Sequence, residues 1–293
     1  MTIAASVNSS IRRVVVALLI TASVVACSDT ADEPATGTAP STSPAPSSAS
    51  ASPTSSTPAS AVAVESLRAE VIARRPHDKT AFTEGLEIAG GKLYEGTGLR
   101  GESVLRESDP RTGVVSRRIA LDDKYFGEGI TVVDDSIVQL TYQEHVAFVY
   151  RLSDFKQIST YTYDTEGWGL CDDGTRFVMS DGTNQLYLRD RASFAIKSTV
   201  AVTNNGVPVD RLNELECVDG QVYANVWQTD TIVRIDPATG KVTAVIDASG
   251  LLTAAEAKEV DVLNGIAYDA SKKSFLITGK YWPTMFEVRF VTR

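Results

Sequence analysis

The chain has 293 residues and a formal net charge of −9 at pH 7, with 43% hydrophobic and 22% charged residues. This acidic balance argues against nucleic-acid binding, because contacts to phosphates need a basic face. The sequence contains 2 histidines, His77 and His145, which excludes most zinc enzymes with several histidine ligands and leaves few candidates for a Ser-His-Asp triad.

The N-terminal residues have the pattern of an export signal. Arg12 and Arg13 precede an apolar run over residues 14–25 that ends in Val-Val-Ala, directly before Cys27. The run is too short for a comfortable membrane span, and small residues close it at a cleavage point. We expect residues 1–26 to be a lipoprotein signal peptide, because a cysteine here resembles a bacterial lipobox. Cys27 would be lipidated and would anchor the exported protein at the outer face of the bacterial cytoplasmic membrane. The alternative is an ordinary signal peptide with an incidental cysteine.

Residues 27–64 are expected to be a disordered tether. Residues 28–62 are almost wholly Ser, Thr, Ala and Pro, a composition with no strand or helix period and nothing to bury. The aromatic residues, 3 Trp, 10 Tyr and 9 Phe, all lie between Phe82 and Phe290. The folded unit is therefore expected to span residues 65–293, which is long enough to bury one substantial core.

A repeat runs through this unit. Five segments share a polar or large residue, usually a glycine, and then Leu or Ile, followed by a turn signal and a β-rich run. They are Glu84-Gly85-Leu86, Glu128-Gly129-Ile130, Trp168-Gly169-Leu170, Asn213-Glu214-Leu215 and Asn264-Gly265-Ile266. Steps of 44, 40, 45 and 51 residues separate them, a spacing typical of four-stranded propeller blades but not of a β-sandwich. The sequence predicts an all-β fold, a five-bladed β-propeller.

The runs after the turns supply the expected strands. Residues 137–142, 177–180, 222–227 and 275–278 are rich in β-branched and aromatic residues. Only residues 251–260, Leu-Leu-Thr-Ala-Ala-Glu-Ala-Lys-Glu-Val, favour a helix. They fall inside the longest step, so we expect a short helical insertion before the fifth blade.

Two cysteines occupy equivalent places in the third and fourth repeats. Cys171 and Cys217 each begin a Cys-x-Asp-Gly motif. Neighbouring blades bring equivalent positions close together, and an exported domain meets an oxidising environment. We therefore predict a disulfide between them; two buried thiols are the alternative.

Equivalent positions should also converge on the propeller axis, because the first strand of each blade lines the central channel. A first ring would hold Glu84, Glu128, Trp168, Asn213 and Asn264. A second set comprises Gly98, Tyr142, Gly182, Trp227 and Lys280, which lie twelve residues after the Leu or Ile of their motifs, or fourteen in the last repeat. Carboxylates, amides and aromatics around one axis predict a polar pocket rather than a packed channel, although a cation site or a sugar site has a similar composition.

Five ordered motifs resemble those of the glutaminyl-peptide cyclotransferases of the plant and bacterial type. The motifs are Pro76-His77-Asp78 with Ala81-Phe82-Thr83-Glu84-Gly85-Leu86, Phe126-Gly127-Glu128-Gly129, Glu166-Gly167-Trp168-Gly169-Leu170, Leu212-Asn213-Glu214-Leu215-Glu216 and Thr278-Gly279-Lys280-Tyr281-Trp282-Pro283. The resemblance covers residues 70–293, one motif per repeat. It implies a five-bladed propeller and an aminoacyltransferase that converts N-terminal glutaminyl residues of peptides or proteins to pyroglutamate and releases ammonia.

The resemblance also implies roles for polar residues. The α-amine must lose a proton and the departing nitrogen must gain one, and a single carboxylate can do both. Glu128 matches this position, and no metal or cofactor is required. Asn213 matches a residue that would hydrogen-bond the substrate amide. Lys280 matches a lysine that would orient Glu128 or stabilise a developing oxyanion.

Aromatic residues would enclose the cyclising side chain. Phe82, Trp168 and Trp227 match aromatic pocket positions of the family. Two residues depart from its pattern: Glu84 stands where glutamine is common, and Tyr142 stands where tryptophan is usual. A second carboxylate near Glu128 would raise the pKa of one of the pair, could shift the pH optimum and could help to bind the substrate's ammonium.

Two further function classes stay open. One is a non-catalytic propeller at the cell surface that binds amine-bearing or sugar ligands. The other is a metal-dependent, lactonase-like hydrolase, which would need a sixth repeat and a convergent metal set. We expect a monomer whose only membrane contact is the lipid anchor. A structural cation in the channel is compatible with the sequence but is not supported by it.

Overall fold

The computed structural model describes residues 63–293, and this part of the chain is almost entirely β-structure. The expected signal peptide, the lipidation site Cys27 and the tether up to residue 62 lie outside the described residues. Among residues 63–293, no helix is long and apolar enough to cross a membrane.

Three sheets are each built from four consecutive strands that pair with their chain neighbours in antiparallel order. The first contains β2 (Thr83–Ala89), β3 (Lys92–Thr97), β4 (Val104–Ser108) and β5 (Val115–Ala120). The second contains β6 (Gly127–Val133), β7 (Ser136–Thr141), β8 (Val146–Arg151) and β9 (Gln157–Thr162). The third contains β10 (Leu170–Asp172), β11 (Phe177–Ser180), β12 (Gln185–Arg189) and β13 (Ile196–Ala201).

The remaining strands form one ten-stranded sheet that joins two such four-stranded units. One unit is β16 (Leu212–Val218), β17 (Gln221–Val226), β18 (Thr231–Asp236) and β19 (Lys241–Asp247). The other is β20 (Leu263–Asp269), β21 (Ser274–Gly279), β22 (Thr284–Thr292) and the N-terminal β1 (Glu65–Pro76). A small hairpin of β14 (Thr203–Asn204) and β15 (Val207–Pro208) pairs with the edge of β19.

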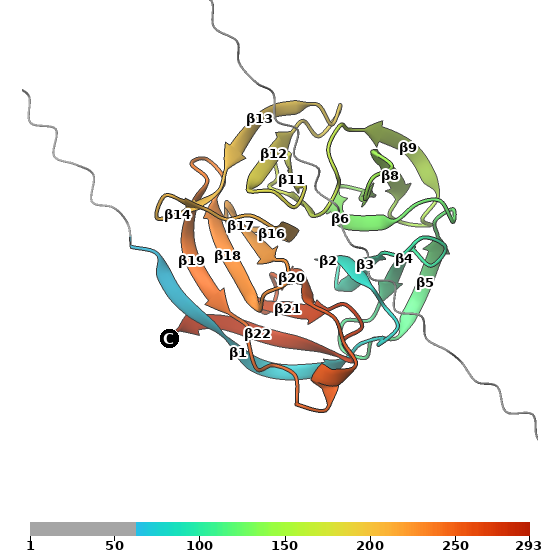
Figure 1. The fold of residues 1–293 in the computed structure, drawn as a ribbon. Helices are drawn as coiled ribbons and strands as arrows, with labels where there is room; N and C mark the ends of the chain where they lie inside the picture. Colours follow the sequence, from blue (N-terminus) through green and yellow to red (C-terminus); the bar gives the residue numbers. More distant parts are fainter. Residues whose placement is uncertain (1–62) are drawn as a thin grey trace, which may run out of the picture. The chain divides into compact units, whose positions relative to one another are not determined.

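The N-terminal strand fastens the two units together. β1 pairs antiparallel with β22 along most of its length and parallel with β19 near its start. The first and last described strands are therefore neighbours (Figure 1). In this way the strand that completes the last unit comes from the opposite end of the chain.

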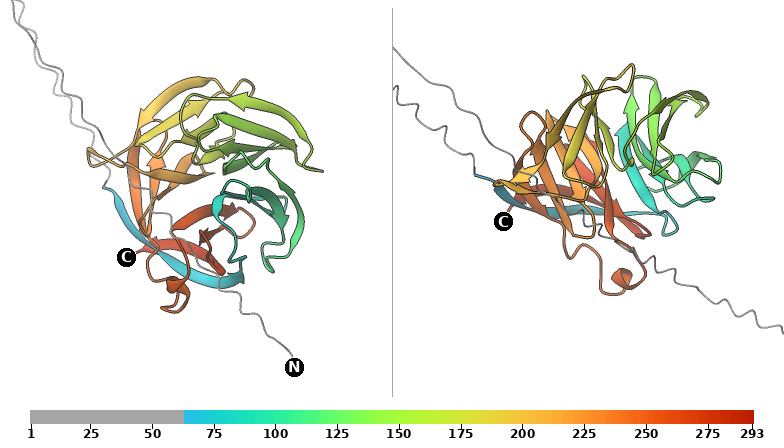
Figure 2. Two further views of the ribbon diagram at one scale, coloured as in Figure 1. Left: turned by 45° about the vertical axis from the view of Figure 1, so that its right-hand side comes forward. Right: turned by 45° about the horizontal axis from the view of Figure 1, so that its top comes forward.

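The innermost strands of the five units follow one another around a common centre. β2 contacts β6 and β20, β6 contacts β10, β10 contacts β16, and β16 contacts β20. Figures 1 and 2 show the sheets radiating from this centre, with the outer strands β5, β9, β13 and β19 at the periphery. Side chains that start on the inner strands therefore meet near one axis.

Glycines on the inner strands permit this close approach. A Cβ on Gly129 would lie 2.5 Å from the carbonyl oxygen of Trp168, and one on Gly169 would clash with the carbonyl oxygen of Asn213. The Gly129 amide instead donates to Trp168 O at 2.8 Å. The glycine of the repeat motif therefore lets neighbouring inner strands touch through their backbones.

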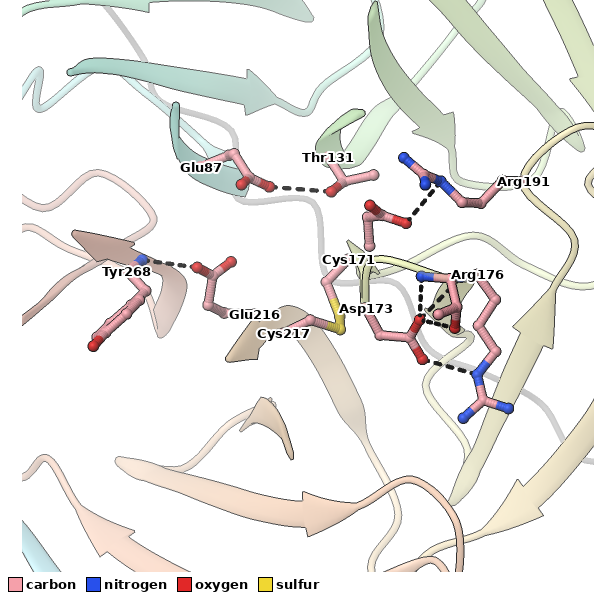
Figure 3. The surroundings of a disulfide bond; sticks show 11 residues. Glu87, Thr131, Cys171, Asp173, Arg176, Arg191, Glu216, Cys217 and Tyr268 are labelled. Carbon is pink, nitrogen blue, oxygen red and sulfur yellow. Dashed lines mark hydrogen bonds and ion pairs between the residues drawn. A yellow bond between two sulfur atoms is a disulfide. The ribbon is translucent and has the colours of Figure 1, made fainter. Parts of the chain in front are cut away.

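The predicted disulfide is present and links two inner strands. Cys171 on β10 and Cys217 on β16 are bonded, with a Cα–Cα distance of 5.5 Å. In the same layer Thr131 donates to Glu87 at 3.1 Å and the Tyr268 amide donates to Glu216 at 2.8 Å (Figure 3). Covalent and polar links thus join neighbouring sheets close to the axis.

The short helical insertion predicted for residues 251–260 is present only as one 3₁₀ turn, η1 (Glu256–Lys258). Thr253 and Glu256 exchange the backbone-to-side-chain bonds of a capping box, but no longer helix follows. The Arg74 guanidinium holds the segment by bonds to Leu251 O and the Glu256 carboxylate. A stretch this short gains too few helical hydrogen bonds to offset nucleation, so these tertiary contacts determine its conformation.

Candidate active site

A cavity lies at the edge of the sheets where the inner strands begin and the second strands end. Its volume is about 160 Å³. It is lined by Phe82, Glu84, Phe126, Glu128, Tyr142, Trp168, Asn213, Trp227 and Lys280. The fold therefore gathers residues that are up to about two hundred positions apart in the sequence into one site.

The structure brings together the eight catalytic and substrate-binding residues expected from the sequence. Asn264, the fifth member of the predicted ring, does not line the cavity. Its side-chain amide instead donates to Thr83 O and to the Glu84 carboxylate. Phe126 lines the cavity but was not expected there. Its spacing from Glu128 equals that of Phe82 from Glu84, so the repeat itself contained the signal.

The two glycines of the second predicted set leave room for the cavity walls. A Cβ on Gly98 would collide with the Phe126 ring, and one on Gly182 would lie 2.6 Å from the Trp168 ring. Aromatic side chains fill the space that larger residues would occupy here. These two positions therefore support the walls without lining the cavity.

The aromatic wall is continuous. The Trp168 and Trp227 rings meet edge to face, with centroids 5.5 Å apart. Tyr142 lies between Phe126 and Trp168, at 5.7 and 6.5 Å. The Trp168 indole donates to Glu166 at 3.1 Å, which fixes its ring. An apolar side chain segment placed here would be shielded from water.

The two carboxyls of the cavity differ in their partners. Glu84 accepts a hydrogen bond from Lys280 Nζ at 2.7 Å through one oxygen and from Asn264 at 3.1 Å through the other. Lys280 Nζ also lies 4.3 Å from the centre of the Phe82 ring. The ammonium that we expected to orient Glu128 or an oxyanion is thus directly bonded to Glu84.

Burial dominates the titration of both carboxyls. It raises the pKa of Glu84 to about 7, against the opposing effect of the Lys280 ammonium. Burial and the negative charge of Glu84 raise the pKa of Glu128 well above its ordinary value. A carboxyl with a raised pKa can both accept and donate a proton near neutral pH.

One amide at the cavity has an unused acceptor. Asn213 is 2% exposed, and its Oδ1 atom has no hydrogen-bond partner within the described residues. Buried carbonyl oxygens are normally paired. Asn213 is therefore ready to accept a hydrogen bond from a ligand N–H group.

Metal ligation has no clear candidate in the same region. Within residues 63–293, no group of three or more His, Cys, Asp or Glu side chains is arranged to hold a metal ion.

Three comparisons with known proteins agree with one another. The sequence model of the glutamine cyclotransferase family matches residues 45–290. A glutaminyl-peptide cyclotransferase of Arabidopsis thaliana is 40% identical over 226 residues, which cover 75% of this chain and 70% of that protein. The crystal structure of Myxococcus xanthus glutaminyl cyclase superposes with a TM-score of 0.74 and 36% identity, covering 78% of this chain and 99% of the other. The chain belongs to the glutamine cyclotransferase family.

Proposed function

We propose that the chain is a glutaminyl-peptide cyclotransferase that converts N-terminal glutaminyl residues of peptides or proteins to pyroglutamate. The observation that carries the proposal is one cavity in which the buried Glu128 carboxyl, the unpaired Asn213 carbonyl and an aromatic wall lie together. A volume of about 160 Å³ suits one amino-acid side chain folded back on its own amine. Family membership supports the same reaction.

The reaction needs one proton transfer and no other reactant. A bond forms between the α-nitrogen and the side-chain amide carbon, and the bond from that carbon to the amide nitrogen breaks. The α-nitrogen loses a proton, the leaving nitrogen gains one, and ammonia departs. We assign this transfer to Glu128, which acts first as base and then as acid. A metal ion is not needed for this chemistry.

The neighbouring residues would hold the substrate in its reactive shape. Asn213 Oδ1 would accept a hydrogen bond from the substrate amide. Phe82, Trp168 and Trp227 would enclose the folded-back side chain, exclude water and favour the conformer in which the amine approaches the amide carbon. The Lys280 ammonium would stabilise negative charge on the amide oxygen during attack.

Ammonia release from a Gln-initiated dipeptide tests the assignment. Glu128→Gln keeps the size of the side chain but cannot transfer the proton, so we expect kcat to fall by roughly 10²–10⁴-fold. Glu70→Gln is the matched control, because Glu70 is a half-exposed carboxylate paired with Arg68 that does not line the cavity, and this variant should retain most of the activity. Equal turnover by Glu128→Gln and the unmodified chain would remove Glu128 from the mechanism.

We also propose that the fold is a five-bladed β-propeller. Five four-stranded units and the closed succession of inner strands β2, β6, β10, β16 and β20 support this count. The strand β1 would complete the fifth blade.

We further propose that the protein is an exported, monomeric lipoprotein anchored through Cys27 at the outer face of the bacterial cytoplasmic membrane. The signal-like residues 1–26 and the lipobox-like position of Cys27 support this location. Cell fractionation tests it: Cys27→Ser should move the protein out of the membrane fraction, and an unchanged distribution would contradict lipidation.

A further inference from the structure

The cavity contains two buried carboxyls and one ammonium. Glu84 and Glu128 are 1% and 6% exposed, and Lys280 is 6% exposed. Lys280 Nζ lies 2.7 Å from Glu84 Oε1. One positive charge at this distance can neutralise one carboxylate, and burying a second, unneutralised carboxylate would be costly.

The other ionisable groups around Glu128 do not supply a second positive charge. Besides Glu84 and Lys280, the groups that interact electrostatically with Glu128 include the carboxyls Glu166 and Glu144 and the phenols Tyr142 and Tyr163. Asp261 adds negative charge beside Glu84. Two basic side chains act on the phenols: Arg100, which is hydrogen-bonded to Glu144, and Arg189, which lies over the Phe194 ring. The surroundings of Glu128 are therefore predominantly acidic.

The position of Glu84 is fixed from two sides. Asn264 donates to its second oxygen at 3.1 Å, and the adjacent Thr83 hydroxyl donates to the buried Glu95 at 2.7 Å. Lys280 is held in turn, because its amide donates to Val262 O and the Tyr281 amide donates to Ala81 O. The ion pair is thus built into the fold rather than formed by two free side chains.

We propose that Glu84 is a positioning residue that holds the Lys280 ammonium and thereby leaves Glu128 protonated in the free protein at neutral pH. This inference rests on the proposed function for its catalytic consequence. The two carboxyls then share one proton, with the charge on Glu84 and the proton on Glu128. The negative charge of Glu84, which raises the pKa of Glu128, favours this arrangement.

The catalytic consequence is a smaller difference in proton affinity between Glu128 and the substrate amine. Glu128 must lose its proton before it can act as base, and the substrate α-amine must be neutral to attack. An α-amine has an ordinary pKa of about 7.7–8.0. A carboxyl whose pKa is raised toward this value takes a proton from the amine at a lower cost than an ordinary carboxylate does. An amide at position 84 would free Lys280 to neutralise Glu128, which would then lose its proton at a lower pH.

The test is Glu84→Gln in the whole chain, with kcat/KM for a Gln-initiated dipeptide measured from acid to alkaline pH. Two groups must lose a proton in the unmodified protein, so log kcat/KM should rise with a slope of about 2 on the acid side. In the variant only the substrate amine should titrate in this range. The slope should fall to about 1, because the titration of Glu128 moves down by about 1–3 pH units.

Glu70→Gln is the matched control, since it makes the same change at a half-exposed carboxylate that is paired with Arg68 and does not line the cavity. It should keep the slope of the unmodified protein. Circular dichroism establishes that Glu84→Gln is folded. An identical acid limb in a folded Glu84→Gln variant would overturn the proposal.

Infrared difference spectroscopy gives a readout that does not depend on turnover. The C=O band of a protonated carboxyl should titrate near neutral pH in the unmodified protein, be absent in Glu128→Gln and shift to lower pH in Glu84→Gln. Lys280→Met should shift it to higher pH, a second test if Glu84→Gln does not fold. A band that none of these changes moves would refute the proton assignment. If the bands behave as expected but the unmodified protein releases no ammonia from the dipeptide, the proposed function is refuted and the proton assignment stands.

Discussion

Asn213 shows how one buried atom can indicate a substrate contact. Asn213 lines the cavity, and its buried Oδ1 atom has no partner in the described residues. An unpaired buried acceptor costs free energy that a ligand can recover. The backbone carbonyl of the same residue accepts from Ser180 at 2.7 Å, which holds the residue in place. The side chain is therefore available while the backbone is fixed.

We predict that Asn213→Leu keeps the fold but weakens catalysis. Leucine has a similar size and cannot accept a hydrogen bond, so kcat/KM should fall by roughly 5–30-fold, equivalent to about 1–2 kcal/mol. Steady-state kinetics with a Gln-initiated dipeptide measures the loss, and thermal unfolding checks the fold. A variant with unchanged kcat/KM would show that the substrate does not use this atom.

Residue types at the site were predictable, but their pairings were not. The repeat placed Glu84, Glu128 and Lys280 near one axis because equivalent positions of a repeat converge. It could not show that Lys280 bonds to Glu84, because the direction of a long side chain depends on its tertiary neighbours. Phe126 was missed although its spacing followed the pattern of Phe82.

Elements with a local sequence pattern were predicted correctly, whereas elements shaped by distant contacts were not. The run at residues 177–180 coincides with β11 (Phe177–Ser180), because strand propensity and the preceding turn both act within a few residues. The segment at residues 251–260 has helix-forming residues, yet contacts to Arg74 shape it instead. The pairing of β1 with β22 and β19 joins distant parts of the chain and leaves no local signal.

The disulfide between inner strands should contribute to stability but not to chemistry. It closes a loop with a sequence separation of 46, and a bond of this kind contributes about 2–4 kcal/mol by restricting the unfolded chain. We predict that Cys171→Ser with Cys217→Ser lowers the free energy of unfolding in urea by this amount. Neither cysteine lines the cavity, so kcat should be preserved.

Reductant provides the control for this prediction. It should destabilise the unmodified protein and have no effect on the double-serine variant. Equal urea midpoints for the oxidised protein and the variant would contradict a stabilising role for the bond.

Across the whole molecule, the buried acids around the axis make the fold less stable as pH rises, whereas acids in ion pairs make it less stable as pH falls. A carboxyl with a raised pKa stabilises the fold below its ordinary pKa of 4.5, and this contribution is lost as pH rises through the folded value. Paired acids with a lowered pKa act in the opposite sense, and their contribution is lost toward about pH 2. Burial raises the pKa of Glu84 and Glu87 to about 7. It raises the pKa of three further acids well above 4.5: Glu128, Glu214 and Glu216. In Asp78 and Glu95, charged and hydrogen-bonded partners outweigh burial and lower the pKa to about 2.

His77 acts in the same sense as the acids with a raised pKa, because its contribution to stability is also lost as pH rises. Burial alone would lower its pKa, but Glu95 at 3.1 Å and Trp282 O at 2.6 Å raise it above 6.5. This contribution is complete below pH 6.5 and is lost as pH rises through the folded value.

We therefore predict that the free energy of unfolding is greatest at about pH 4.5 and falls from there toward about pH 8.5. Urea unfolding at a series of pH values measures it. A free energy that rises steadily from about pH 5.5 to 8.5 would show that these acids are ionised in the folded protein.

The closure of the last sheet also fixes an order of events during synthesis. β1 is the first described strand to be translated, and its antiparallel partner β22 is the last. Until β22 has been synthesised, β1 presents an unpaired edge that other chains could join. The cavity, whose Lys280 comes from the loop between β21 and β22, is completed at the same late stage. A nascent chain thus has neither its closing strand nor its full site until β22 has been made.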